Sequence, residues 1–268
     1  MATRAGGSDE ASPELSPPDG ERASWTGGSL ASLAAWLRAH GVDPAFASAA
    51  SDAKSLSELA KEVARGETTL AALPADAGGA PRGAVRRVRV LRLLIRDARG
   101  RVLIEARQEW SDGRVRERGT PLSEKMLRDE DWRDAARRAV VEELGSCLTT
   151  ADDDDDDDDD TRLRRLGRLV TLDESSVSFA SADRTSASYP GLRSAYDFVT
   201  VDARVRGLPE CDGTFAPTRD KRETRRGTEN GEPSFTSTER NADGTALVAT
   251  WVWRGGYVVD DGTEEAVL

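Results

Sequence analysis

One segment, residues 129–145 (DEDWRDAARRAVVEELG), constrains the fold more than any other, because its apolar residues recur at the spacing of an amphipathic helix. Asp129 can cap its N-terminus, and Gly145 stands where a helix closes in a left-handed turn. At about 100° per residue, Glu143 falls in the middle of the apolar face and Glu142 on its flank. The expected buried residues are Trp132, Ala135, Ala136, Ala139, Val140 and Leu144.

The two glutamates near the end of this segment set the chemistry that we expect. A carboxylate that points into an apolar face needs a partner, because an unpaired buried charge is costly. Glu142 and Glu143, adjacent at the inner edge of a helix, form a candidate site for Mg²⁺, which takes oxygen ligands and usually one or two carboxylates. The alternative is an exposed pair whose aliphatic stems cover the edge of the core.

The sequence RRAVVEELGS resembles the second half of the Nudix box, G-x5-E-x7-R-E-U-x-E-E-x-G-U, where U is a bulky apolar residue. Three residues depart from this signature: Glu124 stands at the opening Gly, Ser146 at the last apolar position and Ala139 at the Glu that follows the Arg. In the family that Glu is a principal metal ligand or base. The residues that match are Glu130, Arg138, Val140, Glu142, Glu143 and Gly145.

The resemblance implies a Nudix-like α/β/α sandwich with a mixed sheet. It also implies metal-dependent hydrolysis of a diphosphate that is linked to another moiety, with Mg²⁺ or Mn²⁺ as cofactor. Glu142 and Glu143 would hold the metal and Arg138 would orient a carboxylate. The base would come from Glu130 or Glu174.

Arginines are interspersed among the apolar residues of 85–96, and guanidinium groups match phosphate geometry. Arg87 and Arg89 are therefore candidate substrate-binding residues, although solvated arginines at the edge of a strand explain the pattern better. The segment 189–192 (YPGL), followed by an aromatic strand and a late tryptophan strand, also resembles Nudix-like proteins of plants and algae with altered boxes.

Composition narrows the possible classes of function. The net charge of −11 argues against general nucleic-acid binding, and no apolar run reaches the roughly 20 residues of a membrane span. One histidine and two cysteines exclude a histidine-based triad, a multi-histidine metal site and a disulfide framework. Carboxylates remain as the main acid–base and metal-binding groups, and a reducing, cytoplasmic setting is the default expectation.

Four regions are expected along the chain. Residues 1–27, rich in Ser, Pro, Gly and acidic residues, are predicted to be a disordered leader. Residues 28–70 are predicted to be a small helical region, residues 71–83 a linker, and residues 84–260 the Nudix-like domain.

The helical region should contain two short helices, over residues 29–40 and 55–65. Ser55 and Glu58 form a capping box at the start of the second helix, and glycines follow both helices. These helices pack on the main domain or form a small appendage, and their alternative roles are to recognise a partner or to shape the substrate cleft. The sequence does not identify a protein partner.

Two insertions are expected in the main domain. Residues 150–161 contain a run of nine aspartates, whose mutual repulsion opposes folding, and residues 209–244 are polar with scattered Pro and Gly. Both are predicted to be disordered.

Strands are expected from apolar runs. Residues 85–96 should form a central strand, with residues 101–108 as its hairpin partner. Further strands are expected over residues 163–172, 194–205 and 246–253, with a serine-rich loop over 175–188.

Three functions remain open at this point. The first is a metal-dependent diphosphate hydrolase. The second is a catalytically impaired Nudix-like domain that binds a nucleotide or diphosphate, which Ala139 favours. The third is a protein-interaction module that uses the helical region.

Overall fold

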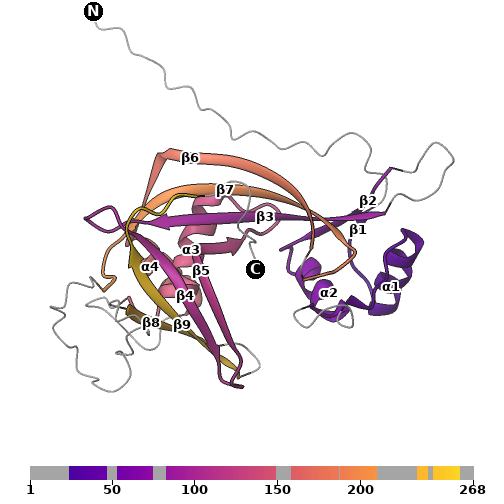
Figure 1. The fold of residues 1–268 in the computed structure, drawn as a ribbon, viewed down its shortest axis with the longest axis horizontal. Coiled ribbons are helices and arrows are strands. Elements are labelled where there is room, and N and C mark those ends of the chain that lie inside the picture. The colour runs from indigo at the N-terminus through magenta and orange to yellow at the C-terminus, as the bar shows by residue number, and fades with distance from the viewer. Residues whose placement is uncertain are drawn as a thin grey trace, which may run out of the picture.

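The computed structural model describes residues 24–46, 53–74, 83–148, 158–186, 188–209, 234–240 and 244–259. These residues form a mixed α/β structure that is rich in strands (Figure 1). In chain order the elements are β1 (Ser24–Trp25), α1 (Leu30–Ala39), α2 (Leu56–Ala64), β2 (Thr69–Ala72), β3 (Ala84–Ile95), β4 (Val102–Trp110), β5 (Val115–Lys125), α3 (Trp132–Leu144), α4 (Asp159–Gly167), β6 (Val170–Thr185), β7 (Arg193–Val205), β8 (Ser234–Arg240) and β9 (Ala246–Arg254). Within these ranges, no helix has the length and apolar character needed to cross a bilayer.

Strand β3 is the centre of the nine-stranded sheet that these residues form. The order is β1-β2-β3-β5-β4-β9-β8, and β7 pairs with β3 and then with β6. The β3–β7 pair is parallel, whereas the other pairs are antiparallel. Strand β5 pairs with β4 through its first part and with β3 through residues 122–125. The end of β5 therefore lies where the two parts of the sheet meet.

The hairpin expected between residues 85–96 and 101–108 is wrong. Strands β3 and β4 share only the bridge from Arg96 to Val102, and β5 lies between them in the sheet. The turn itself is present, because the Gly100 amide donates to the Asp97 carbonyl oxygen at 3.1 Å. A turn sequence fixes where the chain reverses, but the apolar faces decide which strand becomes the neighbour.

Helix α3 packs on one face of the sheet, with α4 beside it (Figure 1). Its predicted inner face is confirmed, since all six apolar residues named above are buried in one core with β3, β5, β7 and β9. The predicted cap is wrong: Asp131, not Asp129, is the N-cap and accepts a hydrogen bond from the Arg133 amide. The Glu130 carboxylate instead accepts from the Leu127 amide, so the chain turns before the helix begins.

Gly145 ends α3 for a different reason from the one predicted. Its φ is −58°, in the right-handed region, so the helix does not close in a left-handed turn. A Cβ at this position would lie 2.2 Å from the Val141 carbonyl oxygen and 2.9 Å from Nη2 of Arg162. Close approach of other atoms, and not an unusual φ, requires glycine here.

The N-terminal helical region contains both expected helices. The Ser55–Glu58 capping box is confirmed at α2, and Gly41 and Gly66 follow the helices with positive φ. The two helices lie at one end of β3 (Figure 1) and share a second core with Trp25, Leu70, Tyr189 and Leu192. Strands β1 and β2 join this region to the main sheet.

Some boundaries differ from the expected ones. Residues 24–25 of the expected leader form β1, and residues 71–72 of the expected linker belong to β2. The remaining expected leader before residue 24, and most of the linker, residues 75–82, lie outside the described residues.

Two predictions in the second half of the domain are wrong. Residues 163–167, expected in a strand, belong to helix α4, and the expected serine-rich loop belongs largely to the long strand β6. Asp158, inside the aspartate run, caps α4 by accepting from the Thr161 amide. A carboxylate at a helix N-terminus is stabilised by the backbone amide groups there. The charge of the aspartate run alone does not predict this stabilisation. Residues 149–157 lie outside the described residues.

Strand β8 lies within the expected insertion over residues 209–244. It pairs with β9 along residues 234–240, and Phe235 and Ser237 are buried on the same side. Its polar sequence does not predict a strand, because only one large apolar side chain, that of Phe235, enters the core. Residues 210–233 and 241–243 lie outside the described residues. The strands expected over 194–205 and 246–253 are confirmed as β7 and β9.

Candidate functional site

Arg138 joins α3 to the turn that precedes it and to the end of β5. Its Nε and Nη2 donate to the two carboxylate oxygens of Glu130 at 2.8 and 3.0 Å. Nη1 donates to Glu142 Oε2 at 2.8 Å, and Nη2 also donates to the Lys125 carbonyl oxygen at 2.9 Å. Burial opposes ionisation of Glu130, but the hydrogen bonds from Arg138 and Leu127 outweigh it and lower its pKa. This arrangement holds Glu130 ionised and fixes the residues next to Lys125.

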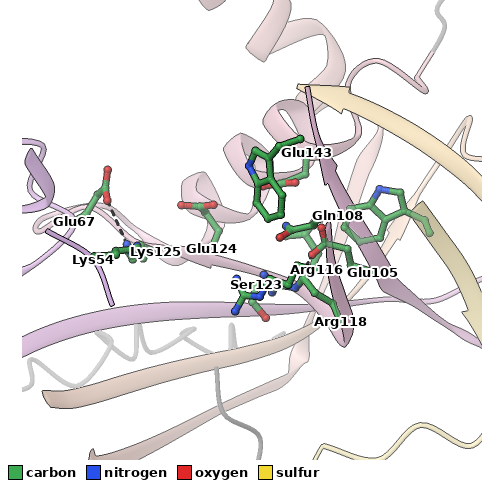
Figure 2. A pocket seen from close by; sticks show the side chains of 13 residues that line it. Lys54, Glu67, Glu105, Gln108, Arg116, Arg118, Ser123, Glu124, Lys125 and Glu143 are labelled. Carbon is green, nitrogen blue, oxygen red and sulfur yellow. Dashed lines mark ion pairs between the residues drawn. The ribbon is translucent and has the colours of Figure 1, made fainter. Parts of the chain in front are cut away.

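A pocket of about 320 Å³ opens beside this arginine, between α3 and strands β4 and β5. Figure 2 shows Lys54, Lys125 and Glu67 at one end of the pocket and Glu105, Gln108, Arg116 and Arg118 at the other. Glu124 lies between the two ends, and Glu143 reaches the pocket from α3. Trp110, Leu122, Ser123 and Trp251 complete the lining.

Three carboxylates of the pocket, Glu143, Glu124 and Glu105, resist ionisation. Burial raises the pKa of Glu143 to about 8, and the charges of Glu105, Glu239 and Glu124 add to the effect. Burial also raises the pKa of Glu124 to about 7, although the nearby Arg138 opposes the shift. Such values suit groups that exchange protons or bind a cation near neutral pH.

Glu105 is the most deeply buried of these carboxylates. Glu105 as a whole is 4% exposed, and its Oε2 pairs with Arg118 Nε at 2.9 Å. Burial raises its pKa, while Arg118 and the nearby Gln108 amide act in the opposite direction. Oε1 accepts no hydrogen bond of normal geometry from the described residues. A buried oxygen of this kind can accept a proton or a ligand hydrogen bond.

Ala139 lies in the core and not in the pocket. It is fully buried against the apolar cluster beneath α3, with 0% exposure. Glu124 approaches the helix from β5 instead, with Oε1 3.6 Å from Arg138 Nη1. Glu124 therefore places a carboxylate beside Arg138 from the neighbouring strand, at the position where the signature has its opening Gly.

The structure separates the two predicted metal ligands. Glu143 lines the pocket, whereas Glu142 lies on the outer side of α3 and binds Arg138. The side chain of Glu142 is 47% exposed. Arg138, Glu130 and Glu142 form one connected group beside the pocket, but none of the three lines it.

The other predicted site residues also lie away from the pocket lining. Glu174, on β6, makes a bidentate ion pair with Arg133 at 2.9 and 2.6 Å. Arg89 donates to the carbonyl oxygens of Leu127, Arg128 and Glu130, and so holds the turn before α3. Arg87 lies on β3 opposite Thr69 of β2.

The sequence prediction missed several pocket residues. Glu124 was visible only as a mismatch to the signature, and Lys54 lies in the helical region, far from the box in sequence. A usable signal was the scarcity of lysine, because two of the four lysines in the chain, Lys54 and Lys125, line this one pocket. Glu105 gave no sequence signal, because its role depends on which strands flank β4.

The pocket partly suits a divalent cation. Within the described ranges, no three His, Cys, Asp or Glu side chains lie close enough together to hold an ion. Yet three glutamates of raised pKa, Glu105, Glu124 and Glu143, line the same pocket. Mg²⁺ is commonly held by one or two carboxylates, with substrate phosphate oxygens and water as the other ligands. The residues fit a cation that arrives with such a substrate and do not form a complete cage.

Comparisons with known proteins give no assignment for this chain. No model of a known protein family matches it, and no curated protein matches it significantly.

The pH dependence of stability should reveal the buried Glu143. Between the usual pKa near 4.5 and the folded-state value near 8, the folded chain keeps a proton that the unfolded chain releases. The free energy of unfolding therefore falls as pH rises through this window, and Glu143→Gln should remove that part of the fall. We expect the Tm of the variant to exceed the wild-type Tm by about 2–8 °C at pH 8.5. At pH 4.5 the two should melt together, and an equal difference at both pH values would contradict the buried position of Glu143.

Proposed function

We propose that this chain is a Nudix-like hydrolase that cleaves a diphosphate linked to another moiety, with Mg²⁺ or Mn²⁺ as cofactor. We also propose that its sheet and helices are a variant of the Nudix α/β/α sandwich. The observation that carries the proposal is the pocket beside α3, where Glu143 and Glu124 lie among four cationic side chains, Lys54, Lys125, Arg116 and Arg118. Carboxylates suit a cation and the cationic groups suit phosphate oxygens, so the pocket offers both halves of a metal–diphosphate site.

The proposed division of roles follows from exposure and contacts. Glu143 and Glu124 would hold the metal, and Glu124 takes the place that the signature gives to a carboxylate at position 139. A divalent metal would neutralise the diphosphate oxygens and so favour attack at phosphorus. Arg138 and Glu130 are positioning residues, because their hydrogen bonds hold the end of β5 against the start of α3.

Glu105 is the proposed base. Its Oε1 would accept a proton from water as the water oxygen forms a bond to phosphorus and the bridging P–O bond breaks. The Arg118 ion pair on Oε2 fixes the carboxyl group, and the water would have to reach the buried Oε1. A raised pKa makes this carboxylate a stronger base than an exposed glutamate.

The test is phosphate or nucleotide release from a panel of nucleoside-diphosphate-linked compounds, with Mg²⁺, with Mn²⁺ and with a chelator. We expect metal-dependent cleavage of at least one compound. Absence of cleavage across the panel, with no metal-dependent change, would refute the hydrolase.

The second candidate is a binding module that holds a diphosphate compound without cleaving it. Ala139 in the core and the incomplete carboxylate cage favour this function. Calorimetric titration with the same panel separates the two, since a binding module would show affinity without products. A pure protein-interaction module should bind none of the compounds.

A further inference from the structure

Lys54 reaches the pocket from outside the Nudix-like domain. It directly precedes Ser55, the N-cap of α2, where the capping box with Glu58 fixes the helix start. The Lys54 amide also donates to the Ser188 carbonyl oxygen at 2.7 Å. These contacts fix the backbone of Lys54 at the end of the helical region that lies next to the pocket.

Glu62 of α2 gathers three cations around one buried carboxylate. Oε1 accepts from Lys54 Nζ at 3.0 Å and from Lys125 Nζ at 2.8 Å, and Oε2 pairs with Arg86 Nη2 at 2.7 Å. Glu67 adds one more carboxylate, 3.5 Å from Lys125 Nζ. Three cations therefore surround the Glu62 carboxylate, and one of them, Lys125, also contacts Glu67.

Two of the three cations around Glu62 face the pocket. Arg86 is 3% exposed and lies over the Tyr189 ring, away from the pocket lining. Lys54 and Lys125 both line the pocket, and the side chain of Lys54 is 30% exposed. Burial and the charge of Lys125 lower the pKa of Lys54, although Glu62 opposes the shift. The two ammonium groups thus share Oε1 of Glu62, and Lys125 has a second contact at Glu67.

An ammonium group has three N–H donors, and the pair with Glu62 occupies one donor of Lys54. Both lysines line the pocket, and Figure 2 shows them at the end of the pocket that lies on one side of Glu124. Preorganised cations of this kind bind phosphate oxygens without the entropic cost of ordering a long side chain.

We propose that Lys54 of the N-terminal helical region and Lys125 of β5 together bind a phosphate group of the substrate. The helical region is then part of the substrate site and not an appendage. This inference rests on the diphosphate chemistry proposed above. It assigns the lysine end of the pocket to one of the two phosphate groups.

The first test measures binding of inorganic pyrophosphate by calorimetry in metal-free buffer with a chelator. We expect Lys54→Gln to weaken binding by about tenfold or more and Lys54→Arg to retain most of it. Lys61→Gln is the matched control, since Lys61 is an exposed lysine of the neighbouring helix α2 and its substitution should leave binding unchanged. Equal affinity in wild type and Lys54→Gln, equal loss in the Lys61 control, or no pyrophosphate binding by wild type would overturn the inference.

A second measurement uses the unaltered protein. Because the chain has four lysines, acetylation of each can be followed by mass spectrometry. At saturating concentration, pyrophosphate should slow acetylation of Lys54 by about fivefold or more, because the bound phosphate covers the amine. Acetylation of Lys61 should be unaffected. Unchanged acetylation of Lys54 at saturating pyrophosphate would overturn the inference even if a variant failed to fold.

Turnover separates this inference from the proposed function. With a cleaved compound, Lys54→Gln should raise KM about tenfold and change kcat much less, because the lysine contacts substrate and transition state alike. Cleavage by wild type with an unchanged KM in Lys54→Gln would refute the lysine pair and leave the hydrolase intact. Pyrophosphate binding that depends on Lys54, without cleavage of any compound, would refute the hydrolase and leave the lysine pair intact.

Discussion

Glu143→Gln is expected to lower metal-dependent turnover by about 100-fold or more, because the amide cannot supply the negative oxygen that a metal or a proton requires. The substitution keeps the size of the side chain and removes a charge that burial disfavours, so the fold should remain intact. The measurement is kcat and kcat/KM with a cleaved compound, beside a thermal melt of the same preparation.

Matched variants locate the effect. Glu142→Gln lies one residue away but outside the pocket, and we expect it to retain turnover within about fivefold, the effect of weakening an exposed ion pair. Glu124→Gln should weaken metal affinity, while Glu105→Gln should lower kcat and leave metal affinity nearly unchanged. If Glu142→Gln lost more turnover than Glu143→Gln, the group formed by Glu142, Arg138 and Glu130, and not the pocket, would be the site.

Glu62→Ala is expected to reduce the free energy of unfolding by about 3–5 kcal/mol, the cost of leaving buried charges without their partner. Burial opposes ionisation of Glu62, but Arg86, Lys125 and Lys54 together hold its pKa well below the usual range. Its contribution to stability is therefore present above about pH 4.5 and is lost as pH falls toward the lower folded-state pKa. Urea unfolding of wild type and variant at pH 7 measures the difference.

Glu67→Gln provides the control for this substitution. Its nearest contacts, to Arg65 at 3.2 Å and Lys125 at 3.5 Å, are longer than those of Glu62, and we expect a loss within about 1 kcal/mol. A double-mutant cycle of Glu62→Gln with Arg86→Met then isolates the 2.7 Å pair. A loss of less than about 1 kcal/mol for Glu62→Ala would show that the cluster does not hold α2 against β3.

Local patterns predicted much of the secondary structure. The buried stripe of α3, the capping box of α2 and the strands β7 and β9 follow from periodicity and hydrogen bonding within a few residues. Strand β8 and the second half of β6 did not follow, because their polar sequences depend on neighbours that are distant in the chain. The serine-rich β6 is a strand because β7 supplies its hydrogen bonds.

The candidate site, like the fold, was predicted from the sequence only in part. The sequence by itself left carboxylates as the main candidate acid–base and metal-binding groups and predicted that Glu143 faces inward, because composition and helical spacing depend only on the order of residues. Only the tertiary structure decided that Glu142 turns outward to Arg138 and that Glu105, Glu124, Lys54 and Lys125 line the same pocket. These side chains come from a helix start and two strands, and sheet register and helix docking bring them together. Such long-range packing has no signature within any one segment.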